Sequence, residues 1–323
     1  MTDSTDDKTR ARDSRPRIVV LGSLNMDMVL RVPHMPVAGE TLLGRDLRHV
    51  PGGKGGNQAV SCARQGAQVC LLSCVGRDAY GEQLLASLQG DGIDVSHVMQ
   101  ASDAATGVAV ISVDDAGQNQ IVVLAGANQW LSVPEDLLES LLRDAQFVVL
   151  QFETPLAEVE KTLRIARKVG CRVALNPSPM QAFPQAWWSG IDVLVVNETE
   201  ASALSRLAVG TPQQAAVAAR QLLANGIARV VVTLGANGAV VCDADGTRWH
   251  EAVQVQAVDS TAAGDTFLGA LTVRLAQGAP LDDATQWAMR AAAICVTRAG
   301  AQPSIPHAAE VEQLTSATRW SRI

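Results

Sequence analysis

The sequence is poor in aromatic residues, in positive charge and in long apolar runs. Aromatic side chains make up 3% of the 323 residues, with one Tyr and four Phe, which excludes an aromatic-rich surface for nucleic acid. The net charge of −7 argues against a polyanionic partner such as DNA. No apolar stretch reaches the roughly 18 residues of a membrane span. We therefore expect no nucleic-acid partner and no membrane partner.

Paired cysteines are also missing. The six cysteines stand singly and form no CxxC pair, so we expect buried, reduced thiols. Residues 1–16 are polar and charged and lack the apolar core of a secretory signal, which predicts a disordered tail. Both observations favour a cytoplasmic protein.

Short runs rich in Val, Ile and Leu alternate with longer helical patterns. The predicted strands are 18–21, 68–75, 147–151, 172–176, 193–196 and 229–234. The predicted helices are 57–65, 82–89, 156–169, 198–207, 213–225, 263–277 and 281–298. This alternation predicts one α/β domain over 17–310, with a mostly parallel sheet covered by helices on both faces. A tail or helix over 311–323 would follow it.

Residues 27–50 and 98–124 break the alternation. Each contains short strands of alternating polarity and Gly/Asp turns, such as the turn from Asp114 to Gly117, and no helix separates the strands within either segment. We expect them to form a small β-sheet beside the carboxyl ends of the main strands, where it could act as a lid.

The segment from Asp259 to Asp265 directly precedes a predicted long helix. Its small residues at 262–264 leave the first amides of the helix uncovered, and these amides can bind a phosphate. Asp265 could accept the proton of an attacking hydroxyl there. Alternatively, Asp265 only caps the helix, and local features leave both interpretations open.

A Gly-rich segment, Pro-Gly-Gly-Lys-Gly-Gly-Asn-Gln, covers residues 51–58. It is not a P-loop, because Lys54 is followed by Gly55, and its glycines do not fit the dinucleotide pattern. With Lys54 and Asn57 it could bring backbone and amide donors close to a polyhydroxylated ligand. The alternative is a Gly-rich helix start without a ligand.

Polar residues also follow several predicted strands. Asn25 and Asp27 follow the first strand, Glu153 follows the strand at 147–151, and Asn197 follows the strand at 193–196. The turn 233–238 is suited to close approach by a nucleotide. Each could be a simple cap or turn, but all lie at the edge where an open α/β sheet builds its site.

Taken in order, these segments resemble the PfkB carbohydrate kinase family. The resemblance covers nearly everything from Arg17 to Pro306, and the segments 52–57 and 259–267 match the two signature regions of the family. Further matching stretches are 22–27, 39–41, 106–109, 125–128, 197–201 and 297–303. The resemblance implies the ribokinase-like fold, a three-layer α/β/α sandwich with a mostly parallel sheet and a small β-sheet lid. It also implies a homodimer formed lid against lid.

The resemblance further implies ATP-dependent phosphorylation of a pentose, ribose in the first place, at its 5-hydroxyl. Asp265 would be the base, and Gly264 with its neighbouring amides would form the anion hole. The sugar would be surrounded by Asn25, Asp27, Gly53, Lys54, Asn57 and Glu153. ATP would meet Asn197 and the turn of Thr233, Leu234, Gly235, Ala236, Asn237 and Gly238, with Met289 near the adenine where relatives often carry a polar side chain.

Two metal ions are implied in the same way. Glu200 would help to organise Mg²⁺ through water. K⁺ would be held by Asp259 and Ser304 and by the carbonyl groups of Thr261, Cys295, Arg298 and Gly300.

Rival functions remain open. Within the family the substrate could be 2-deoxyribose, a nucleoside, a ketohexose or a sugar phosphate. Lys54 is the one cationic residue in the sugar segments, which disfavours sugar phosphates, and the aromatic-poor lid disfavours nucleosides. A non-catalytic sugar-binding regulator is a further alternative, against which the presence of Asp265 and Gly264 argues.

Overall fold

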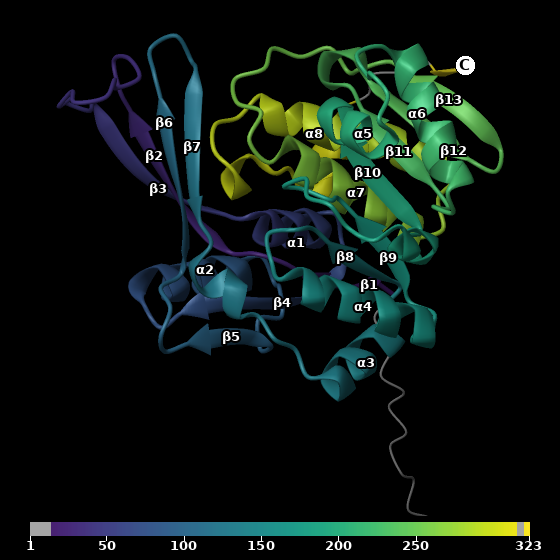
Figure 1. Ribbon diagram of the computed structural model, residues 1–323, viewed down its shortest axis with the longest axis horizontal. Helices are drawn as coiled ribbons and strands as arrows, with labels where there is room; N and C mark the ends of the chain where they lie inside the picture. Colours follow the sequence, from purple (N-terminus) through teal and green to yellow (C-terminus); the bar gives the residue numbers. More distant parts are fainter. Residues whose placement is uncertain (1–13, 315–319) are drawn as a thin grey trace, which may run out of the picture.

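Two β-sheets of different size organise the chain (Figure 1). The computed structural model describes residues 14–314 and 320–323. In spatial order the large sheet contains β14 (Trp320–Arg322), β13 (Gly246–His250), β12 (Ala239–Asp243), β11 (Val230–Thr233), β10 (Val193–Asn197), β9 (Arg172–Leu175), β8 (Phe147–Leu150), β1 (Arg17–Leu21), β4 (Gln68–Gly76) and β5 (Val98–Ala101). The neighbours from β5 to β11 pair in parallel, and those from β11 to β14 are antiparallel. The predicted mostly parallel sheet is confirmed.

Helices cover both faces of the large sheet. One layer contains α1 (Lys54–Arg64), α2 (Ala79–Gly90), α7 (Ala263–Ala276), α8 (Leu281–Val296) and α9 (Ala308–Gln313). The other layer contains α3 (Glu135–Arg143), α4 (Leu156–Val169), α5 (Glu198–Ser205) and α6 (Pro212–Ala224). Short 3₁₀ helices are η1 (Gly126–Trp130), η2 (Gln185–Gly190), η3 (Gly235–Asn237) and η4 (Gln302–Ser304).

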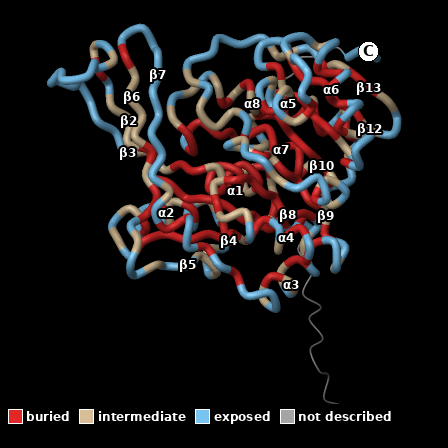
Figure 2. The backbone as a smooth tube through the Cα atoms, viewed as in Figure 1, coloured by how far each residue is buried: buried red, intermediate tan, exposed pale blue. Residues whose placement is uncertain are grey.

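Alternation along the strands explains the two layers. Side chains of successive strand residues point to opposite faces. In β1, Val20 therefore packs into the core below the α1 layer, whereas Val19 and Leu21 pack into the core below the α4 layer. Figure 2 shows these strands and the helix faces against them as buried. Within the described ranges, no helix is both long and apolar enough to cross a bilayer.

The small sheet stands away from the large one, at the left of Figure 1. Its order is β3 (Asp46–Gly52), β2 (Asn25–Arg31), β6 (Gly107–Val113) and β7 (Asn119–Leu124), with β2 and β6 parallel to one another. We call these four strands the lid. Its edge strand β7 is exposed along its whole length, so the lid presents unpaired backbone and apolar side chains to solvent.

The structure differs from the sequence predictions at both ends of the large sheet. The lid prediction is wrong for residues 98–101, because β5 pairs with β4 of the large sheet. The chain already joins β4 before β5 begins, since the Asp94 backbone bonds to Val69 and Leu71. At the other end the hairpin β12–β13 was not predicted, and Trp320–Arg322 adds a strand where a tail or helix was expected. Helix α3 was also missed. Residues 1–13 of the predicted disordered tail lie outside the described residues.

Candidate active site

Helix α7 begins at Ala263 with no side chain capping it. Ala262 directly before it adopts a left-handed backbone conformation, with φ 60°. The amides of a first helical turn have no partner within the helix. A Cβ placed on Gly264 would meet no atom within 4 Å. The Ala263 N–H donates to the Ser260 carbonyl at 3.2 Å, so the start of α7 presents the amides that follow, from Gly264 on, to open space, which suits an anion.

Asp265 lies in this first turn, yet its carboxylate bonds to α1 and not to its own helix. Asn57 Nδ2 donates to Asp265 Oδ2 at 3.0 Å, and Gln58 Nε2 donates to Oδ1 at 2.8 Å. The Asp265 side chain is buried, with 6% of the residue exposed. The alternative that Asp265 only caps α7 is therefore wrong. Gln58 was not predicted as a site residue, although it follows Asn57 directly in the Gly-rich segment.

Further charged side chains gather around Asp265. Burial, with added repulsion from Glu153 and Asp265, raises the pKa of Asp27 to about 7. Burial alone would lower the pKa of the Lys54 ammonium, but Asp265 and Glu153 lie close enough to raise it. The Lys54 backbone N–H donates to Glu153 Oε2 at 3.1 Å. Three predicted sugar residues, Asp27, Lys54 and Glu153, are thus brought together beside the predicted base.

Glycines allow the α1 start to approach β2 this closely. Asn25 is opposite Gly52 in the β2–β3 register. A Cβ on Gly52 would lie 2.3 Å from Asp27 Oδ2, and a Cβ on Gly53 would lie 2.6 Å from the backbone nitrogen of Asn25. Gly53 also has φ 84°, a conformation that side chains disfavour. The Gly-rich segment therefore allows Asn25 and Asp27 to reach the start of α1.

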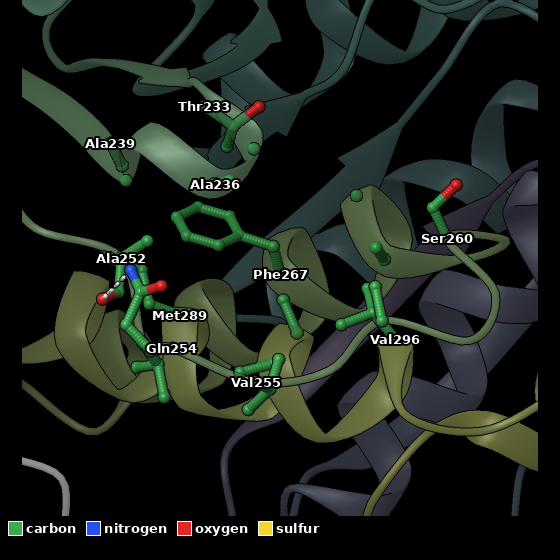
Figure 3. A pocket seen from close by; sticks show the side chains of 18 residues that line it. Thr233, Ala236, Ala239, Ala252, Gln254, Val255, Ser260, Phe267, Met289 and Val296 are labelled. Atoms are coloured by element: carbon green, nitrogen blue, oxygen red, sulfur yellow. Dashed lines mark hydrogen bonds between the residues drawn. The ribbon is translucent and has the colours of Figure 1, made fainter.

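A cavity of about 350 Å³ opens beside Gly264 (Figure 3). Its walls come from the β11–β12 turn, residues 252–260, the start of α7 and one side of α8. Most of the lining is apolar, and Phe267 and Met289 contribute its largest side chains. A flat apolar ring with a phosphate chain directed toward Gly264 fits this combination of walls.

The predicted nucleotide residues divide into two groups. Thr233, Gly235, Ala236, Gly238 and Gly264 line the cavity. The other three, Leu234, Asn237 and Asn197, do not line it. Leu234 packs into the core, Asn237 uses its carbonyl to accept from Trp249 Nε1, and Asn197 lies next to Thr233 in the strand register.

The apolar lining was largely missed from the sequence. Apart from Gln254, the side chains of residues 252–255, Phe267, Ala292 and Val296 carry no polar group that would mark a site. Among the lining side chains beyond the predicted turn and helix start, the sequence pointed only to Met289.

Glu200 is held at the carboxyl end of β10 by a capping box. Asn197 Oδ1 accepts from the Glu200 N–H, while Glu200 Oε2 accepts from the Asn197 N–H at 3.0 Å. Asn176 Nδ2 donates to the same Oε2 at 3.1 Å. Asn176 follows β9 and was missed in the sequence. These contacts occupy Oε2 and fix the carboxylate close to Lys54, whose pKa it also raises.

The predicted K⁺ residues form a hydrogen-bonded unit of two turns. Thr261 donates its N–H and its hydroxyl to Asp259 Oδ1, at 2.9 and 2.6 Å, and the Gly300 N–H donates to Oδ2 at 2.9 Å. Burial opposes ionisation of Asp259, but these bonds lower its pKa below the usual value. Cys295 Sγ lies 3.6 Å from the Thr261 carbonyl and 3.0 Å from Ser304 Oγ.

Arg298 joins this unit through its backbone. Its N–H donates to the Cys295 carbonyl at 3.1 Å, so one lone pair of that oxygen is already used. Its guanidinium turns outward and pairs with Glu310 at 2.5 Å. An ionised carboxylate surrounded by carbonyl and hydroxyl oxygens fits a hard monovalent cation.

One other group has ligand atoms at metal-binding spacing in the described ranges. Atoms of Cys70, Asp94 and His97 lie within 4.8 Å of one another. This group lies where β4 meets the turn before β5, and none of the predicted cation ligands belongs to it.

Comparisons with known proteins agree with this geometry. A ribokinase of Haemophilus influenzae is 41% identical over 293 residues, which cover 90% of this chain and 96% of the relative. A deoxyribokinase of Salmonella typhi is 34% identical over 90% of this chain and 95% of its own. The structure of Arabidopsis thaliana ribokinase complexed with ribose and ATP matches 93% of this chain and 98% of its own, with TM-score 0.87 and 31% identity.

The family model gives the same result. The model of the pfkB family of carbohydrate kinases matches residues 15–308, a span that includes the lid, the Gly-rich segment and the start of α7. These matches confirm the ribokinase-like fold that the sequence resemblance implied. The chain therefore belongs to the pfkB family of carbohydrate kinases.

Proposed function

We propose that this protein transfers the γ-phosphoryl group of ATP to the 5-hydroxyl of D-ribose and forms ribose 5-phosphate. The observation that carries the proposal is the position of Asp265. Its carboxylate lies between the amide-lined start of α7, which opens on the cavity, and the charged cluster of Asp27, Lys54 and Glu153. The carboxylate therefore directly follows the cavity-lining Gly264 and lies beside the charged cluster, where a nucleotide and a sugar could meet.

The cavity side would hold the nucleotide. Phe267, Met289 and Val296 offer an apolar surface for the adenine, and the turn of Gly235 and Ala236 allows close backbone approach. The phosphates would then extend toward Gly264, where the α7 amides can stabilise negative charge. The solved structure with ribose and ATP is of a relative with the same fold.

Mg²⁺ and K⁺ are part of this proposal. Mg²⁺ neutralises phosphate charge during phosphoryl transfer. Glu200 suits a contact with Mg²⁺ through water, because its Oε2 already accepts two hydrogen bonds and its Oε1 is left to accept from a metal-bound water. K⁺ would be held by the unit of Asp259, Thr261 and Ser304 with the nearby carbonyls, close to the start of α7.

The polyol side supplies donors and acceptors in the numbers that sugar hydroxyls need. Asp27 and Glu153 accept, Lys54 donates, and the amides of Asn25 and Asn57 add further polar groups for hydroxyls. Among the described residues, Asn57 Oδ1 is buried without a hydrogen-bond partner, which leaves it available to a ligand. Ribose is favoured over 2-deoxyribose because each of these groups, once buried, needs a partner.

Asp265 would act as the general base. Held by Asn57 and Gln58, its carboxylate can remove the proton of the 5-hydroxyl as the oxygen attacks the phosphorus. The α7 amides would stabilise the charge on the transferring group, and lid closure would exclude water. These contributions position the reactants and stabilise charge electrostatically, and both effects dominate the catalysis of phosphoryl transfer.

The remaining proposals concern the whole protein. A kinase domain over residues 17–310 would pair with a second copy through the lid, whose β7 leaves Ile121, Val122, Val123 and Leu124 more than half exposed. All six cysteines are unpaired thiols, which supports a reducing cytoplasm, where ATP is available.

An ADP-release assay with a panel of sugars tests the proposal. We expect ATP turnover that depends strictly on added sugar, with ribose ahead of 2-deoxyribose, hexoses and nucleosides, and a product phosphorylated at O5 by ³¹P NMR. A preference for 2-deoxyribose or a nucleoside would replace ribose as the substrate. Sugar binding without any turnover would favour the non-catalytic regulator.

A further inference from the structure

Asn128, which no part of the proposed mechanism uses, is a buried amide on η1 directly behind Asn25. It is 1% exposed and lies in the stretch 125–128, far from Asn25 in sequence. Its side chain makes three hydrogen bonds. The Leu24 N–H donates to Asn128 Oδ1 at 2.9 Å, and Asn128 Nδ2 donates to the Leu24 carbonyl at 3.0 Å and to Asn25 Oδ1 at 2.8 Å.

The backbone of Leu24 fixes which way the Asn128 amide points. A backbone N–H can only donate and a carbonyl can only accept, so Asn128 must turn its oxygen to one and its nitrogen to the other. Its second N–H then points to Asn25, where only an oxygen can receive it. The Asn25 amide is thereby forced to place Oδ1 against Asn128 and Nδ2 on the opposite side.

Gly107 leaves the space for this arrangement. A Cβ there would lie 2.2 Å from Asn25 Oδ1 and 2.4 Å from Asn128 Nδ2. The Asn25 backbone is also fixed, since β2 pairs with β3 and β6 at this residue. Neither a rotation of the Asn25 amide nor a shift of its strand is accommodated without breaking the bonds to Asn128.

We propose that Asn128 is a positioning residue for substrate specificity: it makes Asn25 a donor-only group toward the sugar. This inference rests on the proposed function. Asn25 Nδ2 would donate to a sugar hydroxyl oxygen, and that hydroxyl must send its own proton to an acceptor. Asp27 lies two residues along β2, on the same face of the strand, and its carboxylate provides the acceptor. The site thus selects a hydroxyl that bridges Asn25 and Asp27, which we assign to the 2-hydroxyl of ribose.

Asn128→Asp tests the assignment because it changes the hydrogen-bonding pattern and almost nothing of the shape. An Asp in either protonation state cannot donate both to the Leu24 carbonyl and to Asn25. The Asn25 amide would then reverse and present its oxygen to the sugar. We expect kcat/KM for ribose to fall roughly 5- to 150-fold, the usual effect of losing one matched polar contact. For 2-deoxyribose the loss should be smaller, so the ratio between the sugars should fall at least about five-fold.

A double-mutant cycle separates this role from a structural one. In an Asn25→Ala background, Asn128→Asp should leave the ratio of the two sugars unchanged, because the amide that it reorients is gone. The matched control is Gln65→Glu, which also turns a buried amide into an acid, but at the far end of α1 against Pro306 and Trp287. It should lower Tm without changing the ratio.

Other outcomes have defined meanings. Equal losses for both sugars, or the same loss in the Asn25→Ala background, would overturn the role of Asn128. If Asn128→Asp does not fold, Asn128→Ala removes the same donor, and an unchanged sugar ratio in that variant would overturn the role as well. If wild type prefers another polyol, the proposed function fails. The role of Asn128 is then judged by the same cycle, with that polyol and its analogue lacking the bridging hydroxyl.

Discussion

At the scale of single residues, Asp265 depends on two amides that belong to another helix. Asn57 and Gln58 lie in the first turns of α1, and each donates to a different oxygen of the carboxylate. When a sugar occupies the site, Asn57 can exchange this bond for a hydroxyl. Gln58 is fully buried, so it would continue to hold Asp265 during the reaction.

Gln58→Met should therefore weaken the base without removing it. The loss of a hydrogen bond to a charged group costs about 1.5–3 kcal/mol, so kcat/KM should fall at least roughly ten-fold. Most of the loss should lie in kcat, with the affinity for ATP close to that of wild type. Gln65→Met, on a buried amide outside the site, should lower stability and leave kcat/KM close to wild type. A kcat/KM near that of wild type in Gln58→Met would show that Gln58 is only structural.

Asp27 should make stability depend on pH. Its pKa of about 7 in the folded protein lies above its ordinary value of 3.8, mainly because of burial. The folded protein thus holds this proton more tightly than the unfolded chain does. The resulting stabilisation is complete below the ordinary value and is lost as the pH rises to about 7.

Urea unfolding of the sugar-free protein can measure this effect. Relative to Asp27→Asn, the wild type should lose free energy of unfolding between pH 4 and pH 7 and change little above that range. Asp103→Asn, on the exposed loop before β6, serves as the control. A difference between wild type and Asp27→Asn that stays constant with pH would contradict the assignment.

The sequence indicated some site residues and missed others for a physical reason. Asn25, Asp27 and Glu153 follow apolar strands, and this local pattern predicts the catalytic edge of a parallel sheet. Gln58 and Asn128 were missed because their roles depend on contacts with segments more than a hundred residues away. A local pattern cannot show such partners.

At the scale of elements, two turns would hold the proposed cation. The turn before α7 supplies Asp259 and Thr261, and the segment after α8 supplies Gly300 and Ser304. A cation between them would add positive charge close to the amides at the start of α7. The same arrangement would fix the two turns relative to one another.

Replacing K⁺ by tetramethylammonium at constant ionic strength should lower kcat several-fold, an order of magnitude typical of one electrostatic contact. Asp259→Asn should remove most of this dependence on K⁺. Equal rates in both salts for the wild type would eliminate the cation from the mechanism.

The strands of the parallel sheet were predictable because burial on both faces leaves continuous apolar runs. Two of the missed elements, β5 and β14, lack that signal. β5 is short and half exposed, and its pattern is equally suited to the lid. β14 is exposed along its whole length and is defined only by its pairing with β13.

At the scale of the whole molecule, the lid exposes both an unpaired strand edge and apolar side chains to solvent. β7 is an edge strand with four consecutive exposed apolar residues, an arrangement that favours pairing with another chain. A second lid placed against it would bury these side chains and keep water from the sugar.

Val122→Glu should accordingly convert a dimer into a monomer, which size-exclusion chromatography with light scattering would detect. Val217→Glu places the same charge on an equally apolar, half-exposed position of α6 and should remain dimeric. A monomeric wild type, or a dimer in both variants, would show that the lid face has another use.

The central claim is that one carboxylate joins the two halves of the site, and Asp265→Asn tests it most directly. The variant keeps the shape and removes the base. Single-turnover rates with ribose and ATP should fall roughly 10²- to 10⁴-fold, the usual contribution of a general base, with ATP affinity and Tm close to wild type. A turnover rate near that of wild type would contradict the account and place the base elsewhere.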